Sequence, residues 1–320
     1  MYYIGIDIGG MSLKGGIVSE DGRVLKKDTV KTVVGDSQAL IKNAEELCLK
    51  LLYNVPVDVE AIGLGIPGTI NEKNGVIVYS NNIKIEDVHI CEELNKRLGF
   101  PVWADNDANC AALGETLFGG AKGKKNVIFI TLGTGVGTGI IVDGKVMAGF
   151  GGAGAEGGHM VIKSGGIPCN CGRRGCWEAY ASATGLIRET KKCIDKYPDS
   201  ELARIAEGDG RVSGRTAFRA AEAGDKVGRR VVNTYIKHVS EGVVNLINIF
   251  RPDVFVIGGG ISNEGGDFIK RINNYAAKHA FGGKRNVPVE VVKAELLNDA
   301  GILGAAAICM MKRDTDWVRC

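Results

Sequence analysis

The stretch YYIGIDIGGMSLKGGIVSEDGRVL, residues 2–25, decides the fold. It begins as an apolar strand, turns through a glycine loop after Asp7, and continues as a second apolar strand to an Asp-Gly turn. Residues 126–147, NVIFITLGTGVGTGIIVDGKVM, repeat this order around a longer glycine loop. Two copies of one strand, loop, strand and turn unit predict two lobes built on the same plan. The alternative is two unrelated hairpins, because glycine turns are common.

Helical and strand patterns alternate in the rest of the chain. Residues 37–52 carry a one-sided apolar stripe after a serine cap, which predicts a helix, and residues 231–250 are predicted as a long helix that ends before Pro252. Residues 61–66 and 254–257 are short apolar runs that end at glycine or proline, which predicts buried strands. This alternation is typical of an α/β fold with mainly parallel strand pairing, apart from the hairpins. Ligands of such folds bind where the loops gather at the carboxyl ends of the strands.

Composition limits the class of protein. The chain has 320 residues, of which 45% are hydrophobic and 24% charged, as expected for a folded protein of two domains. A net charge of +3, spread along the chain, gives no sign of nucleic-acid or membrane binding. The sequence enters a strand pattern directly after Met1, without a secretion signal, and the apolar run 301–311 is shorter than the roughly 20 residues that span a bilayer. We therefore expect a cytoplasmic protein.

The first glycine loop, residues 7–14, has the groups needed to hold phosphate. Asp7 ends a strand and is a candidate for binding hydrated Mg²⁺. The backbone amides around Gly9 and Gly10 are candidates for phosphate oxygens, and Lys14 for neutralising their charge. The alternative is an ordinary glycine hairpin with a solvated lysine.

Two further glycine segments are candidates for nucleotide binding. The loop within residues 131–139 offers backbone amides at Gly133 and Gly135, with the hydroxyls of Thr131 and Thr134, but lacks the spacing of a P-loop. Gly258 and Gly259 follow a predicted strand, and their bare backbone is suited to packing against a flat base such as adenine. A close contact between a helix and a strand would explain those glycines equally well.

The segment DNDAN, residues 105–109, precedes a predicted helix of small residues. Carboxylates and amides at such a place can bind hydroxyl groups in fixed directions, and one carboxylate is a candidate general base. The alternative is that Asp and Asn simply cap the helix.

The cysteine-rich segment CNCGRRGC, residues 169–176, is the most specific feature of the sequence. Its cysteines, with His159 upstream, supply three sulfurs and one imidazole, which predict a closed and therefore structural zinc site at Cys169, Cys171, Cys176 and His159. Such a site would tether Glu156 and Glu178 as a rigid pair of hydroxyl acceptors, although solvated surface carboxylates are the alternative. The other cysteines are expected in the core or at incidental surface positions: Cys48, Cys91, Cys110, Cys193, Cys309 and Cys320.

Together these motifs resemble the ROK family of bacterial sugar kinases and regulators, within the actin-like ATPase superfamily. The resemblance covers nearly the whole chain and is carried by residues 7–14, 65–68, 106–109, 132–139, 156–159, 169–178, 257–260 and 299–301. It implies a two-lobed α/β fold, related to ribonuclease H, with a cleft between the lobes and a structural zinc knot. The first lobe is expected at 1–110, completed by a helix at 300–320, and the second at 111–299, with the zinc-binding insertion at 156–178. The family usually forms homodimers, and a tetramer is the alternative.

The resemblance also assigns roles. Asp107 is the expected catalytic base for the hydroxyl on carbon six of a hexose, and zinc is expected to shape the site without taking part in the chemistry. Other sugar hydroxyls are expected to bind Asn106, Glu156, His159 and Glu178, with Gly68 nearby. The nucleotide phosphates are expected at Gly9, Gly10 and Gly133 to Gly135, Mg²⁺ near Asp7, and adenine near Gly259. Met11 stands where the family often has threonine, so Ser12 or the backbone is expected to replace that phosphate contact.

The expected reaction is ATP-dependent phosphorylation of glucose to glucose 6-phosphate. N-acetylmannosamine kinase, fructokinase and allose kinase are alternatives, because these enzymes use closely similar residues. Repressors of the family carry a DNA-binding domain ahead of the first glycine loop, which here begins at Asp7, so a regulator is not expected. A sugar sensor without activity would be expected to lack the base at Asp107.

Overall fold

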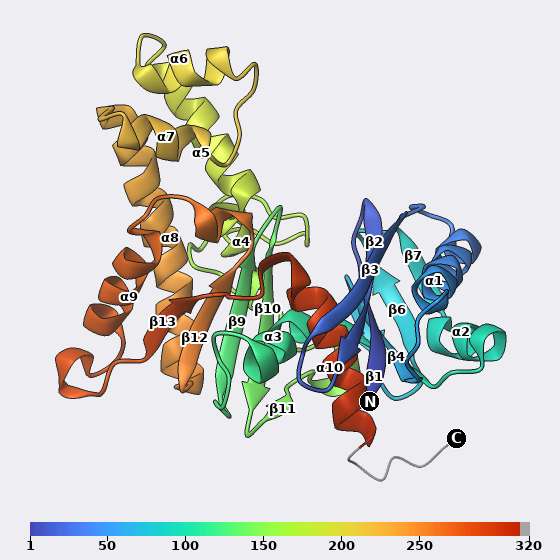
Figure 1. Cartoon of the computed structure of the whole chain (residues 1–320). Coiled ribbons are helices and arrows are strands. Elements are labelled where there is room, and N and C mark those ends of the chain that lie inside the picture. The colour runs from blue at the N-terminus through green and yellow to red at the C-terminus, as the bar shows by residue number, and fades with distance from the viewer. Residues whose placement is uncertain (314–320) are drawn as a thin grey trace. The chain divides into compact units, whose positions relative to one another are not determined.

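The computed structural model describes residues 1–313 (Figure 1). The chain divides into two compact units. Unit 1 contains Met1–Lys125, Gly139–Ala155 and Glu295–Cys320, and unit 2 contains Asn126–Thr138 and Glu156–Ala294. Residues 111–125, 139–155 and 295–299, which the sequence placed in the second lobe, thus cluster with unit 1. Residues 314–320, with Cys320 and the last part of the helix expected at 300–320, lie outside the described residues.

Unit 1 is built on a five-stranded mixed sheet with the order β3-β2-β1-β4-β8. Its strands are β1 (Tyr2–Ile8), β2 (Ser12–Ser19), β3 (Val24–Lys31), β4 (Val59–Ile66) and β8 (Val102–Asn106). The first three strands pair antiparallel, whereas β1, β4 and β8 run parallel. Asp7 lies beside Gly65, and Gly65 beside Asp105, so the parallel strands deliver the first glycine loop and the DNDAN segment to one edge of the sheet.

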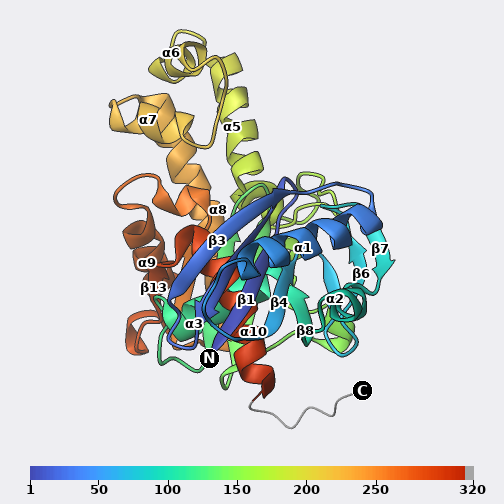
Figure 2. The ribbon, with the colours of Figure 1, turned by 45° about the vertical axis from the view of Figure 1, so that its right-hand side comes forward.

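Helices cover both faces of this sheet (Figure 2). The even-numbered apolar residues of β1, such as Ile4 and Ile6, share a buried core with α1 (Ser37–Leu52) and α2 (Ile90–Leu98). The opposite face, which carries Tyr3, packs on α10 (Ala300–Arg313), and α10 also packs on α3 (Asp107–Phe118). This alternation follows from the two-residue period of a strand.

Two glycines allow α10 to lie directly on the backbone of the sheet. A Cβ atom on Gly5 of β1 would lie 2.0 Å from the Ile302 carbonyl oxygen, and one on Gly63 of β4 would lie 1.8 Å from that of Ala305. The sheet and the helix therefore approach more closely than side chains would permit.

The rest of unit 1 comprises short elements. A three-stranded antiparallel sheet of β5 (Thr69–Asn71), β6 (Val76–Ser80) and β7 (Ile85–Val88) follows β4. Two 3-10 turns, η1 (Phe150–Gly152) and η5 (Leu297–Asp299), lie in the later segments.

Unit 2 carries most of a second five-stranded sheet, with the order β11-β10-β9-β12-β13. Its strands are β9 (Val127–Leu132), β10 (Val136–Val142), β11 (Lys145–Val146), β12 (Val254–Gly258) and β13 (Glu290–Lys293), and the division between the units falls within β10. Strands β9, β12 and β13 are parallel, and Thr131 lies beside Gly258 at their carboxyl ends. The second and third glycine segments of the sequence therefore meet at one sheet edge.

The helical elements of unit 2 follow one another along the chain. They are η2 (Gly157–His159), α4 (Glu178–Ala181), α5 (Ala183–Lys196), α6 (Glu201–Gly208), α7 (Thr216–Glu222), α8 (Lys226–Phe250), η3 (Gly260–Asn263), α9 (Phe268–His279) and η4 (Gly283–Arg285). Helix α8 begins five residues before the predicted 231–250, because Asp225 caps it by accepting the N–H groups of Val227 and Gly228. None of the helices within residues 1–313 is both long and apolar enough to span a membrane.

Candidate functional site

Asn106 organises the start of α3. Its side-chain oxygen accepts the N–H groups of Ala108 at 2.8 Å and Asn109 at 3.3 Å, and its amide donates to the Gly68 carbonyl oxygen at 3.0 Å. The alternative role predicted for this segment, a helix cap, is therefore present. The cap also places the half-buried Asp107 at the first position of the helix, where the partial positive charge of the helix end favours a carboxylate.

Asp105 and Asp107 have different surroundings. The buried Asp105 accepts the backbone N–H of Asn106 at 2.6 Å and the side-chain amide of Asn109 at 2.9 Å. Burial raises the pKa of Asp105, and its hydrogen bond from Asn109 opposes the rise. Asp105 thus supports the turn from within, whereas Asp107, which is only half-buried, is the carboxylate of this pair that a ligand can reach.

The first glycine loop brings Asp7 to the same sheet edge. Asp7 pairs across the strands with Lys14. Burial raises the pKa of the Asp7 carboxyl, and the charge of Lys14 opposes the rise. The carboxylates of Asp105, Asp107 and Asp7 add to the effect of burial in raising the pKa of the Cys110 thiol, so all three lie within electrostatic range of this one group.

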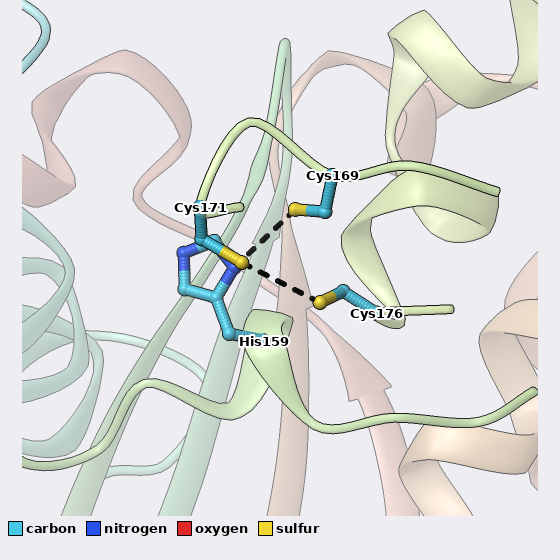
Figure 3. Close-up of side chains that lie close together, drawn as sticks. All are labelled: His159, Cys169, Cys171 and Cys176. Carbon is cyan, nitrogen blue, oxygen red and sulfur yellow. Dashed lines mark hydrogen bonds between the residues drawn. The ribbon is translucent and has the colours of Figure 1, made fainter. Parts of the chain in front are cut away.

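Four side chains of unit 2 converge as the sequence predicts (Figure 3). Cys169 Sγ lies 3.6 Å from His159 Nδ1, and Cys171 Sγ lies 3.6 Å from Cys176 Sγ. All four ligand atoms lie within 4.8 Å of one another. Zinc–sulfur bonds of about 2.3 Å in a tetrahedron require neighbouring ligand atoms about 3.8 Å apart. These four residues could therefore hold a zinc ion whose coordination shell is filled by protein ligands.

Tight turns produce this convergence. The backbone carbonyl of Cys169 accepts the N–H of Gly172 at 3.0 Å, and the backbone N–H of Cys169 donates to the Arg173 carbonyl at 2.9 Å. Gly172 has a φ of +86°, a conformation that residues with a Cβ rarely adopt. Val161 forms a β-bridge to Cys176, which holds the histidine segment beside the cysteine segment.

Glu178 and Glu156 flank the cluster in different ways. Glu178 begins α4, and its Oε2 accepts the N–H of Val136 at 3.0 Å, which joins it to the start of β10. Glu156 Oε2 lies 4.0 Å from His159 Nε2, and its side chain is 58% exposed. Because Nδ1 of this histidine faces Cys169, the ring can contact both the cluster and Glu156. Partial desolvation by the surrounding protein raises the pKa of Glu156, while the charge of His159 opposes the rise and that of Glu178 adds to it.

The two glycine segments of unit 2 have separate anchors. In the second loop, the Gly133 N–H donates to the Gly135 carbonyl at 3.1 Å, and the Thr184 hydroxyl donates to the Thr134 carbonyl at 2.8 Å. Gly259 has a φ of +84°, and a Cβ there would lie 2.5 Å from the backbone nitrogen of Leu132. The glycine at position 259 therefore permits a close contact with the backbone of β9, which is the alternative that the sequence left open. The same contact constrains the loop that follows β12.

Two residues of unit 1 support its loops although no motif in the local sequence predicts this role. Glu115 is completely buried and accepts backbone N–H groups from Gly120 at 2.9 Å and Leu296 at 2.8 Å, which joins the end of α3 to the segment before α10. Thr32, after β3, donates its hydroxyl to the Gly9 carbonyl at 2.6 Å. Their partners are distant in sequence or are backbone atoms, so no motif marks them.

The predicted site residues thus form two sets, each within one unit. Unit 1 contains Asp7, Gly9, Gly10, Ser12, Lys14, Gly68, Asn106 and Asp107. Unit 2 contains Thr131, Gly133, Thr134, Gly135, Glu156, His159, Cys169, Cys171, Cys176, Glu178, Gly258 and Gly259.

Comparisons with known proteins agree on one family. The model of the ROK family matches residues 3–312. The glucokinase of Thermotoga maritima is 37% identical over 311 residues, which are 95% of this chain and 96% of the relative. The structure of a ROK family glucokinase from Streptomyces griseus in complex with glucose and AMPPNP has a TM-score of 0.83 and 33% identity, and covers 96% of this chain and 99% of its own. The structure of the ROK hexokinase of Thermus thermophilus has a TM-score of 0.80 and 32% identity, and the match covers 98% of this chain and 100% of the hexokinase chain.

Proposed function

Because the chain belongs to the ROK family, we propose that it is a glucokinase, which transfers the terminal phosphoryl group of ATP to the hydroxyl on carbon six of glucose. The glucokinase relatives support this choice, since they match almost the entire chain. The observation that carries it is the position of Asp107, a ligand-accessible carboxylate at the start of α3, beside an asparagine that is hydrogen-bonded to Gly68.

Asp107 accepts the proton of the attacked hydroxyl in this mechanism. Phosphoryl transfer depends mostly on alignment and on neutralisation of charge, so a base contributes less than the groups that position the two substrates. Asn106 and the backbone at Gly68 bind neighbouring hydroxyls of the sugar. Their mutual hydrogen bond at 3.0 Å fixes both groups before the sugar arrives.

Glu156, His159 and Glu178 bind further hydroxyls of the sugar. The carboxylate oxygens of Glu156 and Glu178 accept hydrogen bonds, and the imidazole of His159 accepts or donates one, in fixed directions. We assign Zn²⁺ to His159, Cys169, Cys171 and Cys176, where its chemistry is limited to holding the loop. This bracing fixes His159 and, through the short segment 176–178, Glu178.

Residues that contact the nucleotide are proposed within each unit by itself. The loop backbone at Gly9 and Gly10, through the Gly10 N–H, binds phosphate oxygens together with Ser12 and Lys14, and Asp7 orients hydrated Mg²⁺. Backbone at Gly133 to Gly135, with the hydroxyls of Thr131 and Thr134, binds phosphate as well. Adenine packs on the backbone at Gly258 and Gly259, which lies beside Thr131 in the sheet.

We place the protein in the cytoplasm as a homodimer, with a tetramer as the alternative assembly. The free thiols of Cys48, Cys91, Cys110, Cys193 and Cys309 suit a reducing compartment.

An assay of ADP release across a panel of hexoses tests the proposal. The purified protein should phosphorylate glucose with a higher kcat/KM than mannose, fructose, N-acetylmannosamine or N-acetylglucosamine. Equal or better efficiency with N-acetylmannosamine or fructose would assign it to one of the alternative kinases of the family. Failure to consume ATP with any of these sugars would refute the glucokinase assignment and exclude a kinase of any sugar in the panel.

A further inference from the structure

Thr32 makes two hydrogen bonds to the first glycine loop from outside it. Its hydroxyl donates to the Gly9 carbonyl oxygen at 2.6 Å, and its backbone N–H donates to the Met11 carbonyl oxygen at 3.1 Å. Thr32 directly follows β3 and is half-buried. One residue directly after β3 therefore holds two peptide carbonyls of the loop, those of Gly9 and Met11.

These contacts determine where the loop's N–H groups point. The Gly9 carbonyl and the Gly10 N–H belong to one planar trans peptide group, so they point in opposite directions. When Thr32 holds the Gly9 oxygen, it turns the Gly10 N–H away from β3. Its second bond fixes the peptide group of the Met11 carbonyl and the Ser12 N–H in the same way.

The remaining hydrogen bonds of the loop show which amides are left for a ligand. The Gly9 N–H is used within the loop, because it donates to the Ser12 carbonyl at 2.9 Å. Within residues 1–313, the N–H groups of Gly10 and Met11 have no acceptor in the protein. Met11 is 88% exposed, and its side chain has no hydroxyl to offer. Phosphate binding at this loop therefore depends on amide direction.

We propose that Thr32 is a positioning residue for the phosphate donor: its hydroxyl holds the peptide group between Gly9 and Gly10 so that the Gly10 N–H points at a phosphate oxygen of the nucleotide. This inference rests on the proposed function, since it assumes that the loop binds the phosphates of ATP. It adds a residue outside every glycine motif of the chain. It also explains how a loop with methionine at position 11 can retain directed phosphate contacts.

The isosteric variant Thr32→Val tests the role of the hydroxyl. Valine keeps the size and branching of threonine and retains the backbone N–H bond to Met11, so the fold should persist. The matched control is Thr29→Val, on the exposed face of β3 three residues before Thr32, where the threonine hydroxyl has no partner within residues 1–313. Thr32→Ser restores the hydroxyl.

Calorimetric titration with Mg-ADP and with adenosine, in the absence of sugar, provides the decisive measurement. Loss of one directed hydrogen bond should weaken Mg-ADP binding by about three- to tenfold in Thr32→Val. Adenosine affinity should not change, because adenosine lacks phosphate. Thr29→Val and Thr32→Ser should bind both ligands as the wild type does, and the KM for glucose should be unchanged in Thr32→Val.

Two outcomes would overturn the inference: wild-type affinity of Thr32→Val for Mg-ADP, or equal weakening of Mg-ADP and adenosine together with a lower melting temperature. The second outcome would show a general loosening of the fold. The proposed function is tested separately, because the titration needs no turnover. A protein that phosphorylates no hexose but shows the selective loss of Mg-ADP affinity would refute the glucokinase assignment and retain the role of Thr32.

Discussion

The side-chain amide of Asn106 donates a hydrogen bond to the Gly68 carbonyl oxygen at 3.0 Å, while the oxygen of the same side chain caps α3. One side chain thus joins the loop after β4 to the helix that begins with Asp107. The base proposed for the reaction is positioned by its neighbour in the sequence.

The variant Asn106→Asp separates the two roles of this side chain. Aspartate caps a helix about as well as asparagine does, so the melting temperature should stay within a few degrees of the wild type. A carboxylate cannot donate to Gly68 and would repel its carbonyl oxygen, so we expect the KM for glucose to rise by about tenfold or more. Steady-state kinetics and thermal melts measure both effects. An unchanged KM for glucose would show that the Gly68 contact does not shape the sugar site.

Replacing Asp107 by asparagine should remove most turnover. Asparagine can still accept the Ala108 N–H, which lies 2.9 Å from Asp107 Oδ1, so the fold should persist. Loss of a general base typically lowers kcat by about 10²- to 10⁴-fold. Glucose binding, measured by calorimetry, should remain near the wild-type affinity. A wild-type kcat in Asp107→Asn would refute the role assigned to Asp107.

The variant Cys176→Ser tests the proposed zinc site. Loss of one of four ligands should lower the zinc content of the purified protein, its melting temperature and its activity together, because binding of a structural metal contributes directly to folding. Cys193→Ser is a suitable control, since Cys193 is also buried but lies outside the cluster. Elemental analysis gives the zinc content. If wild-type protein purified without chelator contains no zinc, the site has a different role.

Asp7 gives a prediction about pH. Burial raises its pKa above the ordinary value of 3.8, so the folded state binds this proton more tightly than the unfolded state does. The resulting stabilisation is present below pH 3.8 and is lost as the pH rises through the raised pKa. Asp7→Asn carries no such charge. The free energy of unfolding of Asp7→Asn relative to the wild type should therefore increase from about pH 4 to pH 7. The variant should also be less active than the wild type, because it lacks the carboxylate proposed to orient Mg²⁺.

Denaturant titrations at several pH values, without Mg²⁺ or nucleotide, measure this difference. Added Mg²⁺ should reduce the difference at pH 7, because a cation favours the ionised carboxylate. A stability difference that is constant from pH 4 to pH 7 would contradict the assigned shift.

The adjacent glycines at 259 and 260 form a matched pair. A Cβ on Gly259 would lie 2.5 Å from the Leu132 nitrogen and would require a φ of +84°, whereas a Cβ on Gly260 would meet nothing within 4 Å. Gly259→Ala should cost on the order of 1–3 kcal/mol of stability and weaken adenosine binding. Gly260→Ala should change neither quantity much. Equal effects of the two substitutions would show that the Leu132 contact does not shape the loop.

The local sequence was sufficient for elements that are specified by short-range patterns. The apolar stripe of residues 37–52 predicts α1 with its observed bounds, because a helical period is visible within one segment. The cluster of Cys169, Cys171, Cys176 and His159 was predicted for a similar reason: these ligands lie close together along the chain, and few turns can bring them into contact.

Only the tertiary structure decided how distant segments support the site. The Thr32 hydroxyl binds a carbonyl of the first glycine loop, 23 residues away in the sequence, and Glu115 binds backbone N–H groups of the segment before α10. Backbone groups are the same in every residue, so such contacts leave no pattern in the sequence. The sequence by itself determined which chemical groups the chain carries and the local turns that present them. The pairing of β1, β4 and β8 decided that Asp7 and Asp107 are delivered to one sheet edge, because strand neighbours are set by burial of the whole core.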